Sequence, residues 1–131
     1  MYAEYIGEKD TQETQEVRDK LWAWLIDPNH EVKGLIAIND KGVVVGFVHY
    51  RPFPVLSGAE KGGFIDDLFV TPNARGKRIA KELIEAVVKI GKKNNWKGIR
   101  WMTDESNVSA KKAYDKLAIR TNWVTYDIAP L

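Results

Sequence analysis

The sequence predicts a mixed α/β (α+β) fold in which helices pack on both faces of one sheet. Two patterns lead to this prediction: β-branched and aromatic runs alternate with segments whose apolar residues recur every three or four positions. In chain order the segments read helix, hairpin, strand, helix, strand, helix, strand. The strand–helix–strand portion is a βαβ unit, so at least two strands should be parallel, whereas the hairpin adds antiparallel strands. The length of 131 residues is that of one domain.

The first predicted element is a helix over residues 11–26. Its apolar residues fall at helical spacing and share one face: Val17, Leu21, Trp24 and Leu25. The sequence Asp27-Pro28-Asn29 ends this helix, because the residue before a proline disfavours the helical conformation.

A β-hairpin follows the helix. Residues 34–38 and 43–50 are rich in β-branched residues, and the four residues between them, Asn39-Asp40-Lys41-Gly42, are typical of a hairpin connection. Residues 52–59 contain two prolines and are predicted to form a loop.

The centre of the chain predicts the βαβ unit. Residues 64–70 form a short apolar and aromatic run, and residues 98–103 form another. Between them, residues 77–94 carry apolar side chains at helical spacing: Ile79, Leu83, Ala86, Val87 and Ile90. In sheets of this kind ligands bind at the carboxyl ends of the strands, which is where residues 71–77 would lie.

The last part of the chain predicts one more helix and one more strand. The helix has a single apolar stripe: Ala110, Ala113, Tyr114 and Leu117. Residues 123–128 complete the predicted sheet.

Composition restricts the class of protein. The apolar fraction of 44% and the charged fraction of 29% are those of a soluble globular domain. A net charge of +2 gives no argument for nucleic acid, and no apolar run is long enough to cross a membrane. The absence of cysteine rules out disulfides and thiol nucleophiles, and it is compatible with a cytoplasmic protein. The two histidines lack the spacing of metal ligands, so we expect no metal site.

A basic turn at the start of the long helix is the most informative motif. It reads Arg75-Gly76-Lys77-Arg78-Ile79-Ala80, and no acidic residue occurs between Thr71 and Lys81. The first amides of a helix lack internal partners and its dipole is positive there, so three cations at this end favour a bound anion such as phosphate. The alternative is an ordinary surface helix that happens to begin with basic residues.

These residues resemble the GNAT superfamily of acetyl-CoA-dependent N-acetyltransferases. The phosphate motif of that family runs Gln/Arg-x-x-Gly-x-Gly/Ala; Arg75 and Ala80 match it, whereas Arg78 replaces the usual glycine. A second segment, from Asn107 to Tyr114, resembles the Asn-x-x-Ala-x-x-x-Tyr pattern of the family. The surroundings of both motifs are similar to the branch of small histone and polyamine acetyltransferases. The resemblance covers residues 17–128, but the first strand usual in the family is not evident in residues 1–10.

The resemblance implies a mostly antiparallel sheet and a site for acetyl-CoA. The turn would hold the pyrophosphate through its main-chain amides and cations: Arg75, Gly76, Lys77, Arg78, Ile79 and Ala80. The preceding strand would pair with the pantetheine arm through Leu68, Phe69 and Val70, and the amide of Leu68 or Phe69 would polarise the thioester carbonyl. Asn107 would share a helix face with Tyr114 or cap that helix.

The resemblance also implies catalytic roles. Tyr114 would protonate the leaving thiolate, since a phenol with a pKa of about 10 stays protonated at neutral pH; without the resemblance, a core aromatic is the simpler interpretation. Asp66 and Asp67 are the best candidates for the base, because two carboxylates in an apolar strand require a reason. Regular alternation would place them on opposite faces, so one at most would serve. Glu105 and His49 are weaker candidates, and a structural ion pair is the alternative role for either aspartate.

The predicted function is therefore N-acetyl transfer from acetyl-CoA to a primary amine of a polyamine, an amino acid or a lysine side chain, by direct attack in a ternary complex. A non-catalytic acyl-CoA sensor is the alternative. Trp22, Tyr50 and Phe53 are candidates for lining the acceptor cleft. The resembled branch also leads us to expect a homodimer or a larger homo-oligomer.

Overall fold

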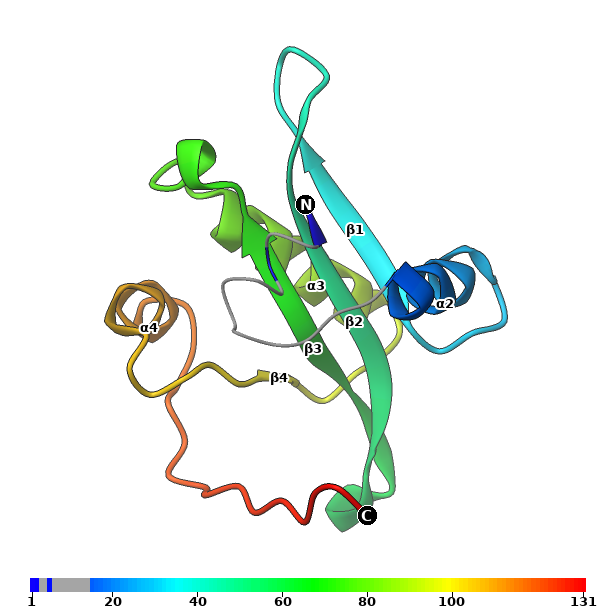
Figure 1. The fold of residues 1–131 in the computed structure, drawn as a ribbon. Helices are drawn as coiled ribbons and strands as arrows, with labels where there is room; N and C mark the ends of the chain where they lie inside the picture. Colours follow the sequence, from blue (N-terminus) through cyan, green and yellow to red (C-terminus); the bar gives the residue numbers. More distant parts are fainter. Residues whose placement is uncertain (3–4, 6–14) are drawn as a thin grey trace.

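The computed structural model of the protein describes residues 1–2, 5 and 15–131. Its sheet has four strands in the order β1-β2-β3-β4: Lys33–Ile38, Val44–Val55, Glu60–Val70 and Ile99–Trp101. The first three strands are antiparallel neighbours, and β4 is parallel to β3. The predicted mixed, mostly antiparallel sheet with a central βαβ unit is thus confirmed (Figure 1).

The long helix α3, Ile79–Lys93, connects β3 to β4 and covers one face of the sheet. Three helix residues, Leu83, Ile84 and Val87, are buried in the main core. They share this core with three inward-facing strand residues: Val48, Tyr50 and Ile65. Trp96, which follows the helix, packs so closely on Gly63 that a Cβ there would lie 2.4 Å from its ring. Glycine at position 63 therefore allows α3 to close onto the sheet.

Helix α2, Gln15–Ile26, lies on the other face. Gly34 on β1 shows this: a Cβ there would point at Leu25 of α2, at 3.2 Å, and at the ring of His49. Gly46 on β2, by contrast, faces Leu83 and Ile79 of α3. The prediction of helices on both faces is therefore confirmed, and residues 11–14 of the predicted first helix lie outside the described residues, as does most of the segment in which a first strand was sought.

The hairpin arm is longer than predicted. Strand β2 continues to Val55 through both prolines, and only Leu56–Gly58 forms a short 3-10 turn, η1. The pairing with β1 ends at Tyr50, so among the described residues β2 beyond that point has a free edge. Pro52 pairs with Gly63, whose amide is directed to the opposite side, toward Gly98. The nitrogen of Pro52 therefore faces the free edge, where a missing N–H costs nothing.

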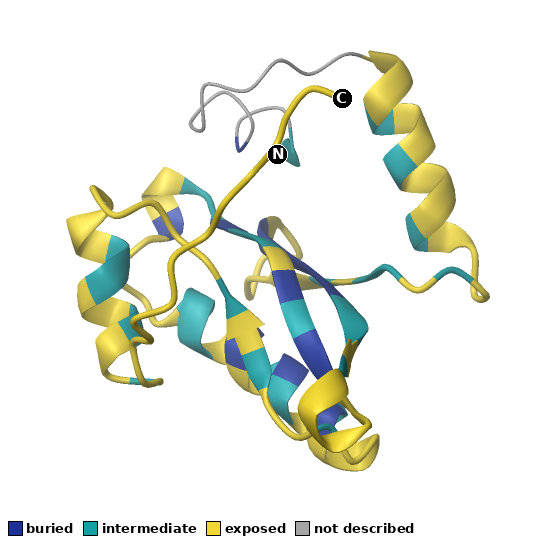
Figure 2. Ribbon diagram, turned by 90° about the horizontal axis from the view of Figure 1, so that it is seen from below, coloured by how far each residue is buried: buried dark blue, intermediate teal, exposed yellow. Residues whose placement is uncertain are grey.

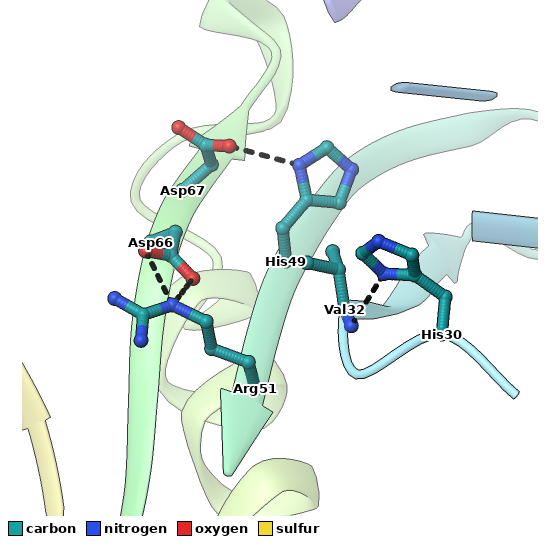
Figure 3. A network of polar contacts seen from close by, with 6 residues as sticks. All are labelled: His30, Val32, His49, Arg51, Asp66 and Asp67. Atoms are coloured by element: carbon teal, nitrogen blue, oxygen red, sulfur yellow. Dashed lines mark hydrogen bonds and ion pairs between the residues drawn. The ribbon is translucent and has the colours of Figure 1, made fainter. Parts of the chain in front are cut away.

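A second departure is a β-bulge in β3. His49 of β2 pairs with Asp67, but the next residue, Tyr50, pairs with Ile65, which leaves Asp66 as an extra residue. A bulge of this kind turns two successive side chains toward one face. The prediction that Asp66 and Asp67 point to opposite faces is wrong: they bind His49 and Arg51, which are two residues apart on β2 and share a face (Figure 3).

The predicted last strand is absent. After the short helix α4, Val108–Asp115, and two further residues, the chain to Leu131 has no regular secondary structure and is exposed along its whole length (Figure 2). Trp123 is 81% exposed and Tyr126 is 91% exposed. The pattern for a strand is present, but within the described residues no second strand lies beside this segment to complete its hydrogen bonds.

Candidate active site

The turn between β3 and α3 has the geometry of an anion cradle. Gly76 adopts a positive φ of 82°, and a Cβ built there would meet no atom within 4 Å, so its backbone is open to a ligand. Arg78 is the N-cap of α3 and makes no side-chain capping bond, which leaves the amides of the first turn for other partners. The side chain of Arg75 reaches back to the carbonyl of Val70, at 3.0 Å, and lies over the ring of Phe69.

Arg78 has a backbone conformation that is uncommon for a residue with a Cβ. Its φ is 63° and its ψ is 18°, which is the left-handed region. This is the residue that stands where the resembled motif has glycine, and the backbone keeps a conformation that glycine adopts without cost. The predicted helix start at residue 77 is accordingly replaced by a start at Ile79.

The two strands β3 and β4 part in the middle of the molecule. Their pairing ends at Ile65 and Trp101, but β3 continues for five residues to Val70. In the described structure β4 does not accompany these residues, so this side of β3 is an open edge. Backbone groups on such an edge form a template for an extended partner.

Two hydrogen bonds tell which amides face this open edge. Gly63 donates its amide to Gly98 on the β4 side, whereas Thr71 donates its amide to Val45 on the β2 side, both at 2.9 Å. Amides alternate between the two edges along a strand, and the bulge resets the alternation once. Counting back from Thr71, the amides of Leu68 and Val70 face the open edge and that of Phe69 faces β2.

A chain of polar side chains crosses the sheet surface just before this edge. The Nδ1 atom of His49 lies 2.9 Å from a carboxylate oxygen of Asp67, and both side chains are largely buried (Figure 3). The hydroxyl of Tyr5 donates a further hydrogen bond to Asp67. The pKa of Tyr5 is raised far above its ordinary value, chiefly by burial and then by the hydrogen bond to Asp67 and the charge of that carboxylate. Tyr114 lies near enough to add a smaller electrostatic contribution to this rise.

Asp66 is held differently. Both of its carboxylate oxygens accept from Nε of Arg51, at 3.0 and 3.2 Å. Burial raises the pKa of Asp66, while the guanidinium of Arg51 opposes that shift. Because Asp66 pairs with a guanidinium whereas Asp67 contacts an imidazole and a phenol, the two adjacent carboxylates are chemically distinct.

Tyr114 is half-buried where α4 meets the end of β4. Its ring makes an edge-to-face contact with Trp101, at 5.5 Å between centroids, and it packs against the main core. Burial raises the pKa of its phenol, so the hydroxyl remains a proton donor at neutral pH. Asn107 is the N-cap of α4 and accepts from the amide of Ala110 at 3.2 Å, which favours the capping role over a shared helix face with Tyr114.

A cleft of about 420 Å³ lies between α2 and the sheet on the His49 side. His49 contributes to its wall, and so does Trp22, one of the three predicted cleft aromatics. The other two lie elsewhere: Tyr50 is buried in the main core and Phe53 packs edge-to-face on Phe64. Apart from His49 and Arg18, the wall consists of apolar residues, tyrosine and glycine, and the described lining contains no carboxylate.

Most predicted site residues therefore come together around the open edge. The exceptions are Asn107, which caps a helix, and Asp66, which pairs with Arg51. Sequence reasoning did not consider Tyr5, and it gave His49, which contacts Asp67, only as a weaker candidate for the base. Neither residue belongs to a sequence motif. His49 contacts Asp67 from the neighbouring strand, and Tyr5 contacts it from a segment that is distant in the sequence.

Comparison with known proteins decides the family. The sequence model of the acetyltransferase (GNAT) family matches residues 1–118. The chain belongs to this family. The acetyltransferase is 32% identical to the D-amino-acid N-acetyltransferase HPA3 of Saccharomyces cerevisiae over 127 residues. The aligned residues make up 96% of this chain and 79% of that protein.

Solved structures agree with this assignment. The ribosomal-protein-alanine N-acetyltransferase of Brucella melitensis biovar Abortus 2308 matches with a TM-score of 0.68 and 27% identity, over 77% of this acetyltransferase and 72% of that chain. A putative acetyl transferase from Pyrococcus furiosus shares the fold, with a TM-score of 0.70 and 21% identity over 100% of this chain and 80% of that one.

The protein is therefore an acyltransferase enzyme whose relatives act on amine-containing acceptors. The family generally uses acetyl-CoA. Among residues 1–2, 5 and 15–131, no three side chains of His, Cys, Asp or Glu are grouped to hold a metal ion. No helix in the described part of the chain has the length and apolar character needed to span a bilayer.

Proposed function

We propose that this enzyme transfers an acetyl group from acetyl-CoA to the primary amine of a small acceptor, by direct attack in a ternary complex. The observation that carries the proposal is the open edge of β3. It presents the amides of Leu68 and Val70 directly before the cationic turn, with Tyr114 on one side and Asp67 at the bulge. An extended donor with a phosphate end matches that order of groups.

The residues of the turn fit such a donor. The amides of the first turn of α3 and the exposed cations Lys77 and Arg78 would hold the pyrophosphate, and Gly76 allows it to approach the backbone. A carbonyl of the pantetheine arm would accept from the edge amide of Val70, as an added strand does, which leaves the amide of Leu68 for the thioester. Arg75 donates to the carbonyl of Val70, and this contact holds the end of β3 against the turn.

The chemistry follows from the groups at the bulge. The amide of Leu68 is the donor that would polarise the thioester carbonyl, since that of Phe69 faces β2. The amine nitrogen forms the new bond to the acetyl carbon as the carbon–sulfur bond breaks. The thiolate takes a proton from Tyr114, whose raised pKa keeps that proton available.

Asp67 is the base that we propose for the amine. A free alkyl ammonium has a pKa of about 10.4, so it must lose a proton before it attacks. Asp67 receives hydrogen bonds from Tyr5 and His49, which fix its orientation, whereas both carboxylate oxygens of Asp66 accept from Arg51.

The cleft favours one acceptor class. Its apolar wall and its single guanidinium, Arg18, suit a small amine that carries an apolar body or a carboxylate, such as an amino acid. A polyamine fits less well, because its further ammonium groups would find no carboxylate in the described lining of the cleft. The D-amino-acid specificity in the name of the yeast relative supports the same class.

The test is amine-dependent release of free thiol from acetyl-CoA, with D- and L-amino acids, spermidine and a lysine peptide as acceptors. Tyr114→Phe should lower kcat by about 10²-fold or more, the contribution usual for a proton donor. Tyr50→Phe is the matched control, because it removes a buried hydroxyl from the main core. Tight binding of coenzyme A without release for any amine would establish the sensor alternative instead.

A further inference from the structure

The cleft between α2 and the sheet has its two basic side chains at opposite ends. Figure 2 shows α2 extending away from the sheet, with its C-terminal end nearer to the strands. Leu25 marks the floor of the cleft, because a Cβ on Gly34 would lie 3.2 Å from Leu25 and 3.4 Å from the ring of His49. Arg18 lines the same cleft about two turns nearer to the outer end of the helix. The cleft therefore runs from His49 at the floor to Arg18 at the mouth.

The helix places Arg18 on the face that forms one wall of the cleft. Leu21, Trp22 and Leu25 follow it by three, four and seven residues, so all four share one face of α2, and all four line the cleft. Helical side chains lean toward the N-terminus of their helix. Arg18 does so, because its guanidinium donates to the side-chain oxygen of Gln15 at 2.7 Å. The cation thus lies toward the outer rim of the cleft and away from its floor.

Helix geometry gives the separation of the two ends. Arg18 precedes Leu25 by seven residues, which corresponds to about 10 Å along the helix axis. The outward lean of the guanidinium adds to this separation. An α-amino acid carries its carboxylate on the carbon next to its amine, so it is too short to occupy both ends at once.

The chemistry of the cleft changes from one end to the other. At the floor, a carboxylate oxygen of Asp67 lies 2.9 Å from His49, which favours an amine there. At the mouth, the guanidinium of Arg18 favours a carboxylate. Between the ends the wall presents apolar surface that the described residues leave uncovered, since Trp22 is 63% exposed and Ile36 is 58% exposed. Such a surface favours an apolar chain.

We propose that the acceptor is an ω-amino acid, in which an apolar chain of about 10 Å separates the amine from the carboxylate. Its amine lies at the floor beside Asp67, its methylene groups pack on the α2 wall, and its carboxylate binds Arg18. Arg18 is then the residue that determines acceptor specificity. The inference rests on the proposed acetyl transfer and narrows its acceptor class to amines with a distant carboxylate.

A series of acceptors of increasing length tests the spacing. Thiol release from acetyl-CoA is measured with glycine, ω-aminobutyrate, ω-aminohexanoate and ω-aminooctanoate, the last of which extends over about 10 Å. We expect kcat/KM to rise toward the longer acceptors, because only these reach Arg18 while the amine is at the floor. A series that does not rise, or in which glycine is the best acceptor, would overturn the proposal.

Substitution of Arg18 tests the carboxylate contact. The readout is the ratio of kcat/KM for ω-aminooctanoate to kcat/KM for octylamine, which lacks the carboxylate. Arg18→Gln should lower this ratio by about 10–100-fold, the effect of one charge-assisted hydrogen bond, and Arg18→Lys should retain part of it. Lys20→Gln is the matched control, because it removes the same charge from the same helix outside the described lining of the cleft. A ratio that Arg18→Gln leaves unchanged, or that both glutamine variants lower equally, would refute the contact.

A binding measurement distinguishes failure of this inference from failure of the proposed reaction. Calorimetric titration of ω-aminooctanoate into the unmodified protein and into Arg18→Gln needs no acetyl-CoA. We expect the affinity to fall by about 10–100-fold in the variant. Such a fall without thiol release for any amine would refute the reaction and leave the carboxylate site standing. Thiol release together with equal affinities in the two proteins would refute the carboxylate site and leave the reaction standing.

Discussion

Asp67 accepts a hydrogen bond from Nδ1 of His49 across the β2–β3 pair, at 2.9 Å, and the bulge at Asp66 places it there. If the strand had no bulge and Asp66 took a regular place in the register, every side chain beyond Asp66 would change face. Asp67 would then point toward α3, and the amide of Leu68 would face β2. A single inserted residue thus sets both the carboxylate and the edge amide on which the proposed chemistry depends.

The two neighbouring aspartates offer a matched pair of substitutions. Asp67→Asn should reduce kcat by about 10²–10⁴-fold, the range for loss of a general base, because an amide cannot take the amine proton. Asp66→Asn changes the same charge one residue away and should leave kcat within a few-fold. Equal losses in the two variants, measured by thiol release, would contradict the assignment of the base to Asp67.

Asp66 also predicts a dependence of stability on pH. Its folded pKa is raised above 3.8, chiefly by burial, so the folded state holds the proton more tightly than the unfolded state. The contribution is therefore most favourable below that value and is lost as the pH rises through the folded pKa. Between pH 3 and 6, thermal denaturation should show the unmodified protein losing stability relative to Asp66→Asn; a constant difference would contradict the raised pKa.

Arg78 carries a backbone conformation that glycine adopts freely. Arg78→Gly should raise the free energy of unfolding by about 0.5–1 kcal/mol, because relief of the left-handed conformation outweighs the added chain entropy of glycine. Arg78→Ala removes the same charge but keeps the Cβ, so it should give no gain. Urea denaturation of the two variants separates backbone relief from charge removal, and equal stabilities would show that φ is not the cause.

The cationic turn predicts a selective loss of affinity. Lys77→Ala combined with Arg78→Ala should weaken coenzyme A by about 10–100-fold, since one charge-assisted hydrogen bond contributes about 1.5–3 kcal/mol. Pantetheine lacks the pyrophosphate and should bind both proteins alike. Calorimetric titration with the two ligands checks this, and a similar loss for pantetheine would remove the phosphate contact from the turn.

Tyr5 should control the acidity of Asp67. Its hydroxyl stabilises the charged carboxylate, so Tyr5→Phe should raise the pKa of that group and move the acid limb of kcat/KM to higher pH. An unmoved acid limb with a lower kcat would indicate that Tyr5 only supports packing. The aromatic ring that remains in Phe still fills the contact with Phe47 and Phe69.

Periodicity and turn chemistry were enough to predict the βαβ unit and the order of the elements as far as α4, but the strand predicted over residues 123–128 is absent. They failed where pairing across strands decides the outcome. Nothing in residues 64–70 reveals that one of them is surplus, because a bulge arises from the register with β2. The two prolines of β2 led to the prediction of a loop over residues 52–59. They fit in a strand because, among the described residues, no strand pairs with that side of β2 once β1 has ended. Tyr5 meets Asp67 only through the tertiary fold, so no sequence pattern could have joined them.

The prolines of the hairpin arm have a consequence for behaviour in concentrated solution. In the part of the chain that the structure describes, β2 beyond Tyr50 projects past β1 with one side unpaired. An unpaired strand edge can pair with other chains and so promote aggregation. Pro52 and Pro54 have no hydrogen to offer along that side, so an incoming chain finds only half of a ladder there. Replacing both with valine would restore the missing donors and convert the arm into a seed for aggregation.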